Sequence, residues 1–147
     1  MEQPAAKEKN LQFLLHYHDD IPIAIIGDDQ RLLQILLNLL GNAIKFTKQG
    51  SVTLTVTISK KPRNREIILS FIVEDTGIGI EEAQQDYIYE EFSRIIPSSK
   101  GLYKGLGLGL TLVKQFVDEM DGEIELTSTL GQGSCFACTI PFKLPLN

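Results

Sequence analysis

The sequence lacks any apolar run long enough to cross a membrane. Its densest apolar stretch, residues 32–40, is interrupted by Gln34 and Asn38 and falls far short of the roughly 20 residues that a membrane helix needs. The N-terminus also lacks the basic start and apolar segment of a secretion signal. We therefore expect a cytoplasmic chain without direct membrane insertion, which is compatible with a membrane anchor elsewhere in a parent protein.

Strong charge of one sign is also missing. The 147 residues carry a net charge of −5, which argues against binding nucleic acid through bulk electrostatic attraction. A net negative charge is still compatible with a local basic patch that binds a phosphorylated small molecule. The length and the 43% of hydrophobic residues fit one domain that folds without disulfides or metal. Residues 1–10 are polar and aperiodic, so we interpret them as a linker or chain end and expect the domain over 11–147.

Cysteine is scarce, and the two that occur, Cys135 and Cys138, form a single C-x-x-C pair. A redox or zinc site with this spacing requires a strand-to-helix turn or a second ligand pair. Residues 134–142 instead alternate like a strand, on which residues three apart point to opposite faces. We therefore predict two separate thiols with a structural role.

Hydrophobic periodicity predicts an α+β domain. Helical spacing covers residues 32–46, after the helix-start residues Asp28 and Asp29, and returns over 107–120. Residues 76–105 break every period except for a weak helical patch at 81–92, which is typical of a lid or binding loop. We expect a two-layer α/β sandwich, with helices on one face of a mixed, mostly antiparallel sheet of about five strands. Alternation predicts strands at 11–17, 21–26, 51–59, 67–75, 123–129 and 134–142, with a basic turn at 60–65.

One face of the first helix is rich in amides. At steps of three and four it carries a single polar stripe, formed by Arg31, Gln34, Asn38, Asn42 and Lys45. Two asparagines are an unfavourable choice for an ordinary solvated face, because asparagine is a weak helix former. An amide oxygen for a hard cation, with an ammonium group one turn away, suits a magnesium-bound polyphosphate. A solvated face is the alternative.

A carboxylate ends the apolar row of the strand at 67–75. Asp75 shares its parity with the core-facing residues, where it is costly unless it is hydrogen-bonded. Either a neighbouring backbone N–H or threonine satisfies it, or it accepts from a ligand such as the exocyclic amine of adenine. Gly77 and Gly79 follow at once and would let the backbone approach a flat ring closely.

A second glycine-rich segment, residues 105–109, leads into the helix at 107–120. Glycines before a helix expose backbone N–H groups at the positive end of its dipole, which favours an anion. The spacing fits neither a dinucleotide-binding G-x-G-x-x-G nor a Walker loop, since Leu110 stands at the final glycine position and no Gly-Lys-Ser/Thr occurs.

Together these segments resemble a known family. Five of them occur in its order and spacing: NLLGNAIKFT at 38–47, DTGIGI at 75–80, EFSR at 91–94, GLGLGL at 105–110 and GQGS at 131–134. They resemble the N, G1, F, G2 and G3 boxes of the ATP-binding catalytic domain of sensor histidine kinases, within the gyrase–Hsp90–histidine kinase–MutL superfamily. The residues within these segments are most similar to those of hybrid kinases. The resemblance implies a Bergerat-type sandwich with a mobile ATP lid over about residues 93–104.

The resemblance implies a phosphate end of the site. Asn42 would ligate a Mg²⁺ ion that bridges the ATP phosphates, Asn38 and Lys45 would lie beside it, and Arg94 would hold the terminal phosphates; Asn38, Lys45 and Arg94 are the implied catalytic residues. The lid and the glycine segment would supply further contacts, from Tyr103, Lys104, Gly105, Leu106, Gly107, Leu108 and Gly109. Many members have glycine at the position of Lys104 and a hydroxyl residue at that of Leu106, so a hydroxyl contact to phosphate would be absent here.

The resemblance also implies an adenine end. Asp75 would accept a hydrogen bond from the adenine amine, while Gly77, Gly79 and Ile80 would line the ring. Ser134 stands where the family places a hydroxyl near the adenine.

Asn38 separates a kinase from an ATPase. The superfamily's ATPases resemble one another in carrying glutamate at this position as the base that activates water, and an amide does not accept that proton. The resemblance thus implies transfer of the γ-phosphate to a histidine on a separate dimerisation domain, with a response regulator or receiver domain involved indirectly. His16 and His18 lie in a strand-like run and are not the expected acceptor. The alternatives are a non-catalytic nucleotide-sensing module and a slow ATPase.

Overall fold

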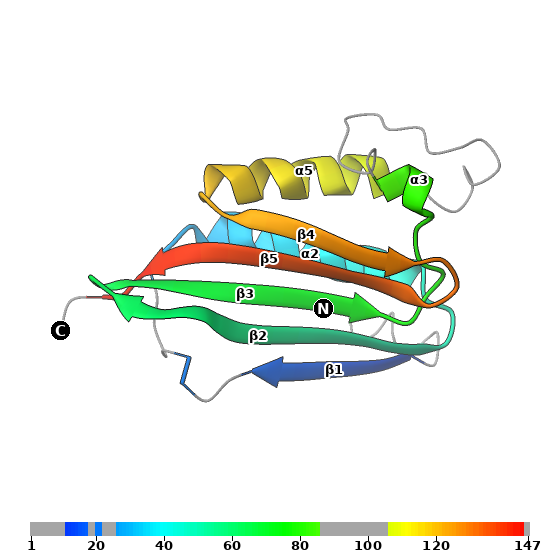
Figure 1. Cartoon of the computed structure of the whole chain (residues 1–147), viewed down its shortest axis with the longest axis horizontal. Helices are drawn as coiled ribbons and strands as arrows, with labels where there is room; N and C mark the ends of the chain where they lie inside the picture. Colours follow the sequence, from blue (N-terminus) through cyan, green and yellow to red (C-terminus); the bar gives the residue numbers. More distant parts are fainter. Residues whose placement is uncertain (1–10, 18–19, 22–25, 86–105, 146–147) are drawn as a thin grey trace.

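The computed structural model describes residues 11–17, 20–21, 26–85 and 106–145, which form one sheet with its long helices on a single face (Figure 1). The elements are β1 (Leu11–Tyr17), α2 (Asp29–Lys45), β2 (Gly50–Arg63), β3 (Glu66–Asp75), α3 (Glu82–Gln85), α5 (Leu106–Glu119), β4 (Glu123–Thr129) and β5 (Gly133–Lys143). No helix in the described ranges is long and apolar enough to cross a bilayer.

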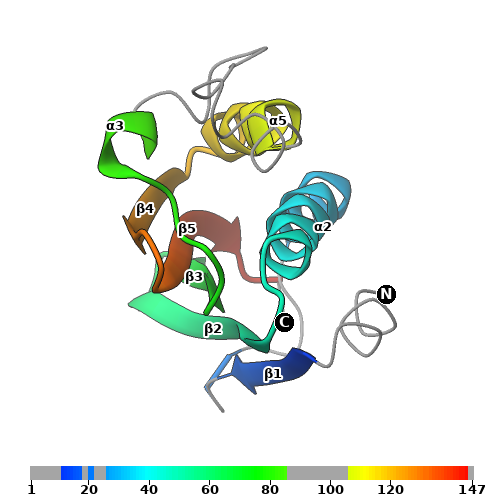
Figure 2. The same cartoon turned by 90° about the vertical axis from the view of Figure 1, so that its right-hand side faces the viewer.

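The five strands lie in the order β1-β2-β3-β5-β4. β1 runs parallel to β2, and the other neighbours are antiparallel. Figure 2 shows α2 and α5 side by side over the same face of this sheet. The predicted α+β sandwich with a mixed, mostly antiparallel sheet is therefore confirmed. In the register, Asp75 of β3 pairs with Val52 on one side and with Ser134 on the other, so the carboxylate lies at the end of a central strand.

The core lies between this sheet and the two long helices. Alternate residues of β3 and β5 point toward the helices, as period-two patterning requires, and each fully buried aliphatic or aromatic side chain contributes about 1.5–3 kcal/mol. The rings of Phe71 and Phe142 meet edge to face, with centroids 6.0 Å apart. The buried side chains of the two strands are Ile67, Leu69, Phe71, Val73, Phe136, Cys138, Ile140 and Phe142; those of the helices include Ile35, Leu39, Ala43, Leu110, Val113 and Val117.

Helix α2 starts and stops through local hydrogen bonds. The Asp28 carboxylate accepts from the backbone N–H of Arg31 at 3.0 Å and caps the helix N-terminus. The Arg31 guanidinium also bonds Asp28 and reaches Glu119 of α5 at 2.8 Å, which ties the start of α2 to the end of α5. At the other end the Thr47 hydroxyl donates to the Ala43 carbonyl at 2.6 Å.

The basic turn predicted at 60–65 is wrong in extent. Strand β2 continues to Arg63, and the turn consists of Asn64 and Arg65, which have positive φ values of 52° and 64°. Positive φ at both turn residues matches the twist of the flanking strands in a tight hairpin. Pro62 is accommodated because the register shifts between Lys60 and Arg63, where ladder hydrogen bonds are interrupted.

Two further expectations fall largely outside the described residues. Of the strand predicted at 21–26 only the ends are described, and Ile26 forms an isolated bridge with Lys143 of β5. The lid expected at 93–104 lies wholly outside them, as does most of the helical patch at 81–92, of which α3 is the described part.

Candidate functional site

Asp75 is held by the backbone of two segments that meet at the end of β3. Its Oδ1 atom accepts from the N–H of Gly77 at 2.9 Å and from the N–H of Ser134 at 3.3 Å. Burial raises the pKa of Asp75 above its ordinary value, and these two hydrogen bonds oppose the rise. Within the described residues Oδ2 has no hydrogen-bond partner. Backbone donors therefore satisfy one carboxylate oxygen and leave the other for a ligand.

A narrow cavity joins this carboxylate to the amide face of α2. It is formed by the last turns of α2, the end of β3 with its following loop, and the start of β5. The volume of the cavity is about 20 Å³, so a purine would enter only if the walls separated. Its lining consists of Leu39, Asn42, Ala43, Phe46, Asp75, Ile78, Gly79, Ile80, Ser134 and Phe136.

Asn42 presents an unpaired amide at this cavity. Its Nδ2 atom is buried and has no hydrogen-bond partner among the described residues. The two ends of an amide are assigned from their hydrogen bonds, so a rotated side chain would place the oxygen at the same point. An unpaired buried amide costs free energy that a ligand would recover.

A magnesium ion fits this donor set. Mg²⁺ is usually held by one or two protein oxygens together with substrate phosphates and water. The described residues contain no group of three or more histidines, cysteines, aspartates or glutamates that would hold a metal alone. Asn42 therefore offers a place for an ion that arrives with a polyphosphate.

The structure divides the predicted polar stripe of α2. Asn42 lines the cavity, while the Gln34 side chain donates to the Asn38 amide oxygen at 3.1 Å one turn earlier. Lys45 is exposed at the helix end, and its ammonium lies 5.4 Å from the centre of the Phe46 ring. Arg31 and Gln34 line a separate open cleft of about 580 Å³ between α2 and α5, which has no lining residue in common with the cavity at Asp75.

The glycines after Asp75 lie against other backbone segments of the protein. A Cβ on Gly77 would lie 2.4 Å from the Phe46 carbonyl oxygen, and a Cβ on Gly79 would lie 2.2 Å from that of Thr129. Gly79 also has a φ of 74°, which favours glycine. Both glycines permit close approach of the protein's own backbone. Gly79 and Ile80 line the cavity, and their contact with an adenine ring stays a prediction.

Sequence reasoning missed three polar residues that hold this loop. Ser128 accepts from the backbone N–H of Ile80 at 2.8 Å and contacts the Ser134 hydroxyl at 2.9 Å. The Gln85 side chain donates to the Ile80 carbonyl at 2.8 Å, and Thr47 lies where a Gly77 side chain would be. Ser128 shares its parity with the half-buried Ile124 and Leu126 of β4, and a hydroxyl on that row is the one signal that the sequence offers. Gln85 lies in an aperiodic segment and gives no signal, because its partners are distant in sequence.

Part of the predicted phosphate end lies outside the description. Arg94, Tyr103, Lys104 and Gly105 are not among the described residues. The next four positions, Leu106, Gly107, Leu108 and Gly109, form the first turn of α5, as expected for a glycine-rich helix start.

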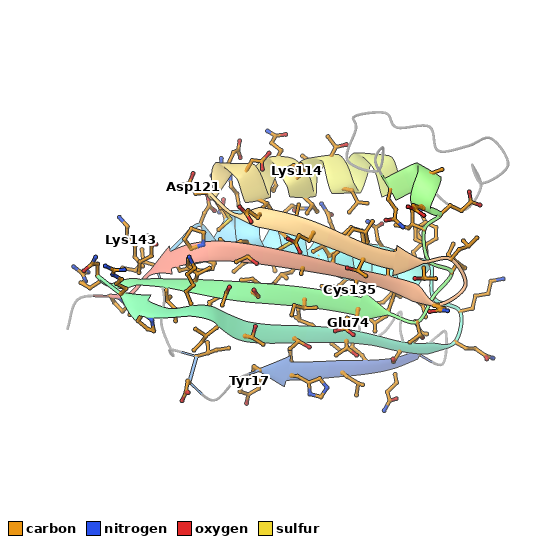
Figure 3. All side chains as sticks on the ribbon, viewed as in Figure 1. Tyr17, Glu74, Lys114, Asp121, Cys135 and Lys143 are labelled. Carbon is orange, nitrogen blue, oxygen red and sulfur yellow. The ribbon has the colours of Figure 1, made fainter. Side chains whose placement is uncertain are left out.

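The two cysteines lie on opposite faces of β5, as predicted. Cys138 is fully buried in the core, and burial raises its pKa to about 12. Cys135 is half-buried on the other face, where it pairs in register with Glu74 of β3 (Figure 3). Burial and the charges of Glu74 and Asp75 raise the pKa of the Cys135 thiol. Both thiols are free, and this geometry offers no shared redox or metal site.

The chain is similar to known proteins over nearly its whole length. Residues 27–144 match the family described as "Histidine kinase-, DNA gyrase B-, and HSP90-like ATPase". The chain is 44% identical over 146 residues to hybrid signal transduction histidine kinase A of Dictyostelium discoideum, covering 95% of this chain and 7% of that protein. It is 40% identical over 141 residues to the autoinducer 2 sensor kinase/phosphatase LuxQ of Vibrio vulnificus, covering 96% of this chain and 16% of that protein.

Solved structures give the same result. Full-length ShkA in complex with AMPPNP superposes with a TM-score of 0.78 at 33% identity, over 99% of this chain and 28% of that chain. The nucleotide-free catalytic domain of histidine kinase ThkA superposes with a TM-score of 0.72 at 25% identity, over 98% of this chain and 88% of that one. The chain thus spans only a small part of the curated relatives' length and superposes on 88% of the ThkA catalytic domain.

Proposed function

Because this chain belongs to the histidine kinase-, DNA gyrase B-, and HSP90-like ATPase family, we propose that it binds Mg-ATP and transfers the γ-phosphate to a histidine on a separate dimerisation domain in two-component signalling. The observation that carries this proposal is that Asn42 and Asp75 line one cavity. An amide for the metal-bound phosphates and a carboxylate for the base thereby lie within one ligand's reach.

The adenine end is formed by acceptors on a rigid backbone. Asp75 Oδ2 would accept from the exocyclic amine, while Oδ1 stays fixed by the N–H groups of Gly77 and Ser134. Ile78 and Ile80 supply apolar walls for the ring. Such a site, apolar with a few convergent polar groups, is the usual form of a nucleotide pocket.

The phosphate end is formed by α2 and by the start of α5. The Asn42 amide oxygen would hold Mg²⁺, which when bound neutralises charge on the phosphates. Lys45 would approach the phosphates from the end of α2, and Arg94 would hold the terminal ones. The first-turn N–H groups of α5, at Leu106–Gly109 in the sequence, favour an anion through the helix dipole.

Asn38 favours transfer over hydrolysis. It lies one turn before Asn42, and its amide oxygen accepts a hydrogen bond from Gln34 at 3.1 Å. An amide is a poor base, so water near the γ-phosphate is not activated from this position. The γ-phosphate is then free for attack by an imidazole presented by another domain.

The test combines the chain with Mg²⁺, ATP labelled in its γ-phosphate, and the separately expressed histidine-bearing helical domain of the same parent. We expect label on the helical domain that is labile in acid and stable in alkali, as phosphohistidine is, and very slow phosphate release by the chain alone. Asn42→Ala should abolish this transfer, and the matched control is Gln30→Ala, which changes an exposed residue of the same helix. Tight ATP binding without transfer would contradict the kinase proposal and favour a nucleotide-sensing module.

A further inference from the structure

The Ser128 hydroxyl on β4 has three neighbours that together exhaust its hydrogen-bonding capacity. The backbone N–H of Ile80 donates to it at 2.8 Å. It donates to the Gly133 carbonyl at 3.0 Å, and its oxygen lies 2.9 Å from the Ser134 hydroxyl. A serine hydroxyl offers one proton and two acceptor positions. Ile80 takes one acceptor position and the Gly133 carbonyl, which only accepts, takes the proton.

This count fixes the direction of the contact between the two serines. With its own proton used, Ser128 meets the Ser134 hydroxyl as an acceptor, so Ser134 is the donor. The proton of Ser134 therefore points away from the cavity that its side chain lines. Toward the cavity Ser134 offers lone pairs alone, beside an Asp75 carboxylate that also only accepts.

The surrounding hydrogen bonds hold Ser128 in this position. Gln85 donates from its side-chain amide both to the Ile80 carbonyl at 2.8 Å and to the Ser128 carbonyl at 3.2 Å. The Gly131 N–H donates to the Ile78 carbonyl at 2.7 Å. The loop that follows β3, which includes Ile78 and Ile80, is thus joined to the β4–β5 hairpin by several hydrogen bonds, and Ser128 takes part in two of these links.

We propose that Ser128 is a positioning residue that fixes Ser134 as a hydrogen-bond acceptor, so that the cavity selects a purine with an amino group at its 6-position and rejects one with a 6-oxo group. This inference rests on the proposed function, because it concerns the base of the same nucleotide. A 6-oxo oxygen in the place of the 6-amino group would face lone pairs of Ser134 and Asp75, which costs more than a missing contact.

The experiment measures dissociation constants of Mg-ATP and Mg-ITP by calorimetry. Ser128→Ala frees the Ser134 proton to turn into the cavity and donate to the 6-oxo group of ITP. We expect the ratio of the ITP constant to the ATP constant to fall about fivefold, the effect of one ordinary hydrogen bond. Loosening of the loop alone weakens both nucleotides together and leaves the ratio unchanged. Ser128→Thr keeps the hydroxyl and should restore the wild-type ratio.

Two further variants sharpen the test. In a Ser134→Ala background Ser128→Ala should no longer move the ratio, because the group that responds has been removed. The matched control is Ser70→Ala, which removes a similar hydroxyl pair, Ser70 with Thr139 at 3.2 Å, elsewhere in the sheet, and should change neither constant by more than about twofold. Should Ser128→Ala fail to fold, Ser128→Cys, whose thiol bonds weakly, is expected to act in the same direction.

The outcomes separate this inference from the proposed function. Suppose that the wild-type chain binds ATP and that the ratio of the ITP constant to the ATP constant is the same in wild type, Ser128→Ala and Ser128→Cys. This outcome would overturn the role of Ser128 and leave the proposed function in place. Wild-type chain that binds neither nucleotide would overturn both. If Ser128→Ala lowers the ratio and still lowers it in the Ser134→Ala background, the role of Ser128 would also be overturned, because Ser134 would then not be the responding group.

Discussion

The backbone N–H of Gly77 donates to Asp75 Oδ1 at 2.9 Å, while the space for a Gly77 side chain is filled by the Phe46 carbonyl and the Thr47 hydroxyl. The end of β3 is thereby packed directly on the end of α2. This contact explains why a carboxylate on a strand and an amide on a helix share a cavity. The geometry of both ends of the site depends on one residue that lacks a side chain.

Gly77→Ala should therefore destabilise the fold and misplace Asp75. Its Cβ would lie 2.4 Å from the Phe46 oxygen, so backbone must move, and we expect the free energy of unfolding to fall by about 2 kcal/mol, as for other overpacked sites. Gly41→Ala is the matched control. Gly41 lies in α2 with nothing within 4 Å of a Cβ, so alanine should raise the free energy by about 0.5–1 kcal/mol. Urea unfolding measures both; equal effects would contradict the packing argument.

Asp75→Asn should weaken ATP binding and stabilise the empty fold. An amide still accepts from Gly77 and Ser134 but presents a donor in place of the second carboxylate oxygen, so we expect affinity to fall about tenfold, or 1.4 kcal/mol. Burial raises the pKa of Asp75, so its ionised form is less stable folded than unfolded. The folded wild-type chain accordingly loses stability as the pH rises from 3.8, the ordinary pKa of an aspartate carboxyl, through the raised pKa of Asp75.

The pH profile tests that sign. The stability advantage of Asp75→Asn over wild type should be full at neutral pH and should vanish below about pH 3.8, where the carboxyl is protonated in both states. Thermal or urea unfolding at a series of pH values gives the difference. An advantage that grew as pH fell would mean that the ionised carboxylate stabilises the fold, contrary to the burial argument.

Asn42→Ala should abolish the magnesium dependence of ATP binding at little cost in stability. The Asn42 amide nitrogen is buried without a partner in the described part of the chain, so its removal relieves an unpaired group while losing packing. Calorimetry with Mg²⁺ and with EDTA gives the dependence, and Gln30→Ala should retain it. Unchanged magnesium dependence in Asn42→Ala would remove this residue as the metal ligand.

Much of the fold follows from periodicity in the sequence. The strand at 123–129 and the rows that end at Asp75 and begin at Ser134 alternate clearly, because one face of the sheet packs on helices and the other does not. Leu15 and Tyr17 share the parity of Phe13 but are 56% and 68% exposed. They lie on β1, which is an edge strand of the sheet. The alternation of residues along a single strand does not reveal whether that strand lies at the edge or in the centre of a sheet.

The site was predictable only in part, for a physical reason. Asn42 and Asp75 could be chosen because an amide on a helix stripe and a carboxylate on an apolar row are each costly where they stand. The close backbone contacts of Gly77 and Gly79 are not visible in the sequence, because the segments that fill the space of their missing side chains, at Phe46 and Thr129, are 31 and 50 residues away by number. Ser128 depends likewise on partners in two other segments.

The two thiols should differ in reactivity because they face opposite sides of β5. Cys138 has a pKa of about 12, so at pH 8 only about one molecule in ten thousand carries its thiolate, and the core also blocks access. Cys135 is half-buried with a raised pKa and should react slowly with iodoacetamide, while Cys138 should react only after unfolding. Mass spectrometry counts the adducts, with Cys135→Ser isolating Cys138. Rapid modification of Cys138 in the native chain would mean that the core opens to the reagent, because the side chain is fully buried in the folded state.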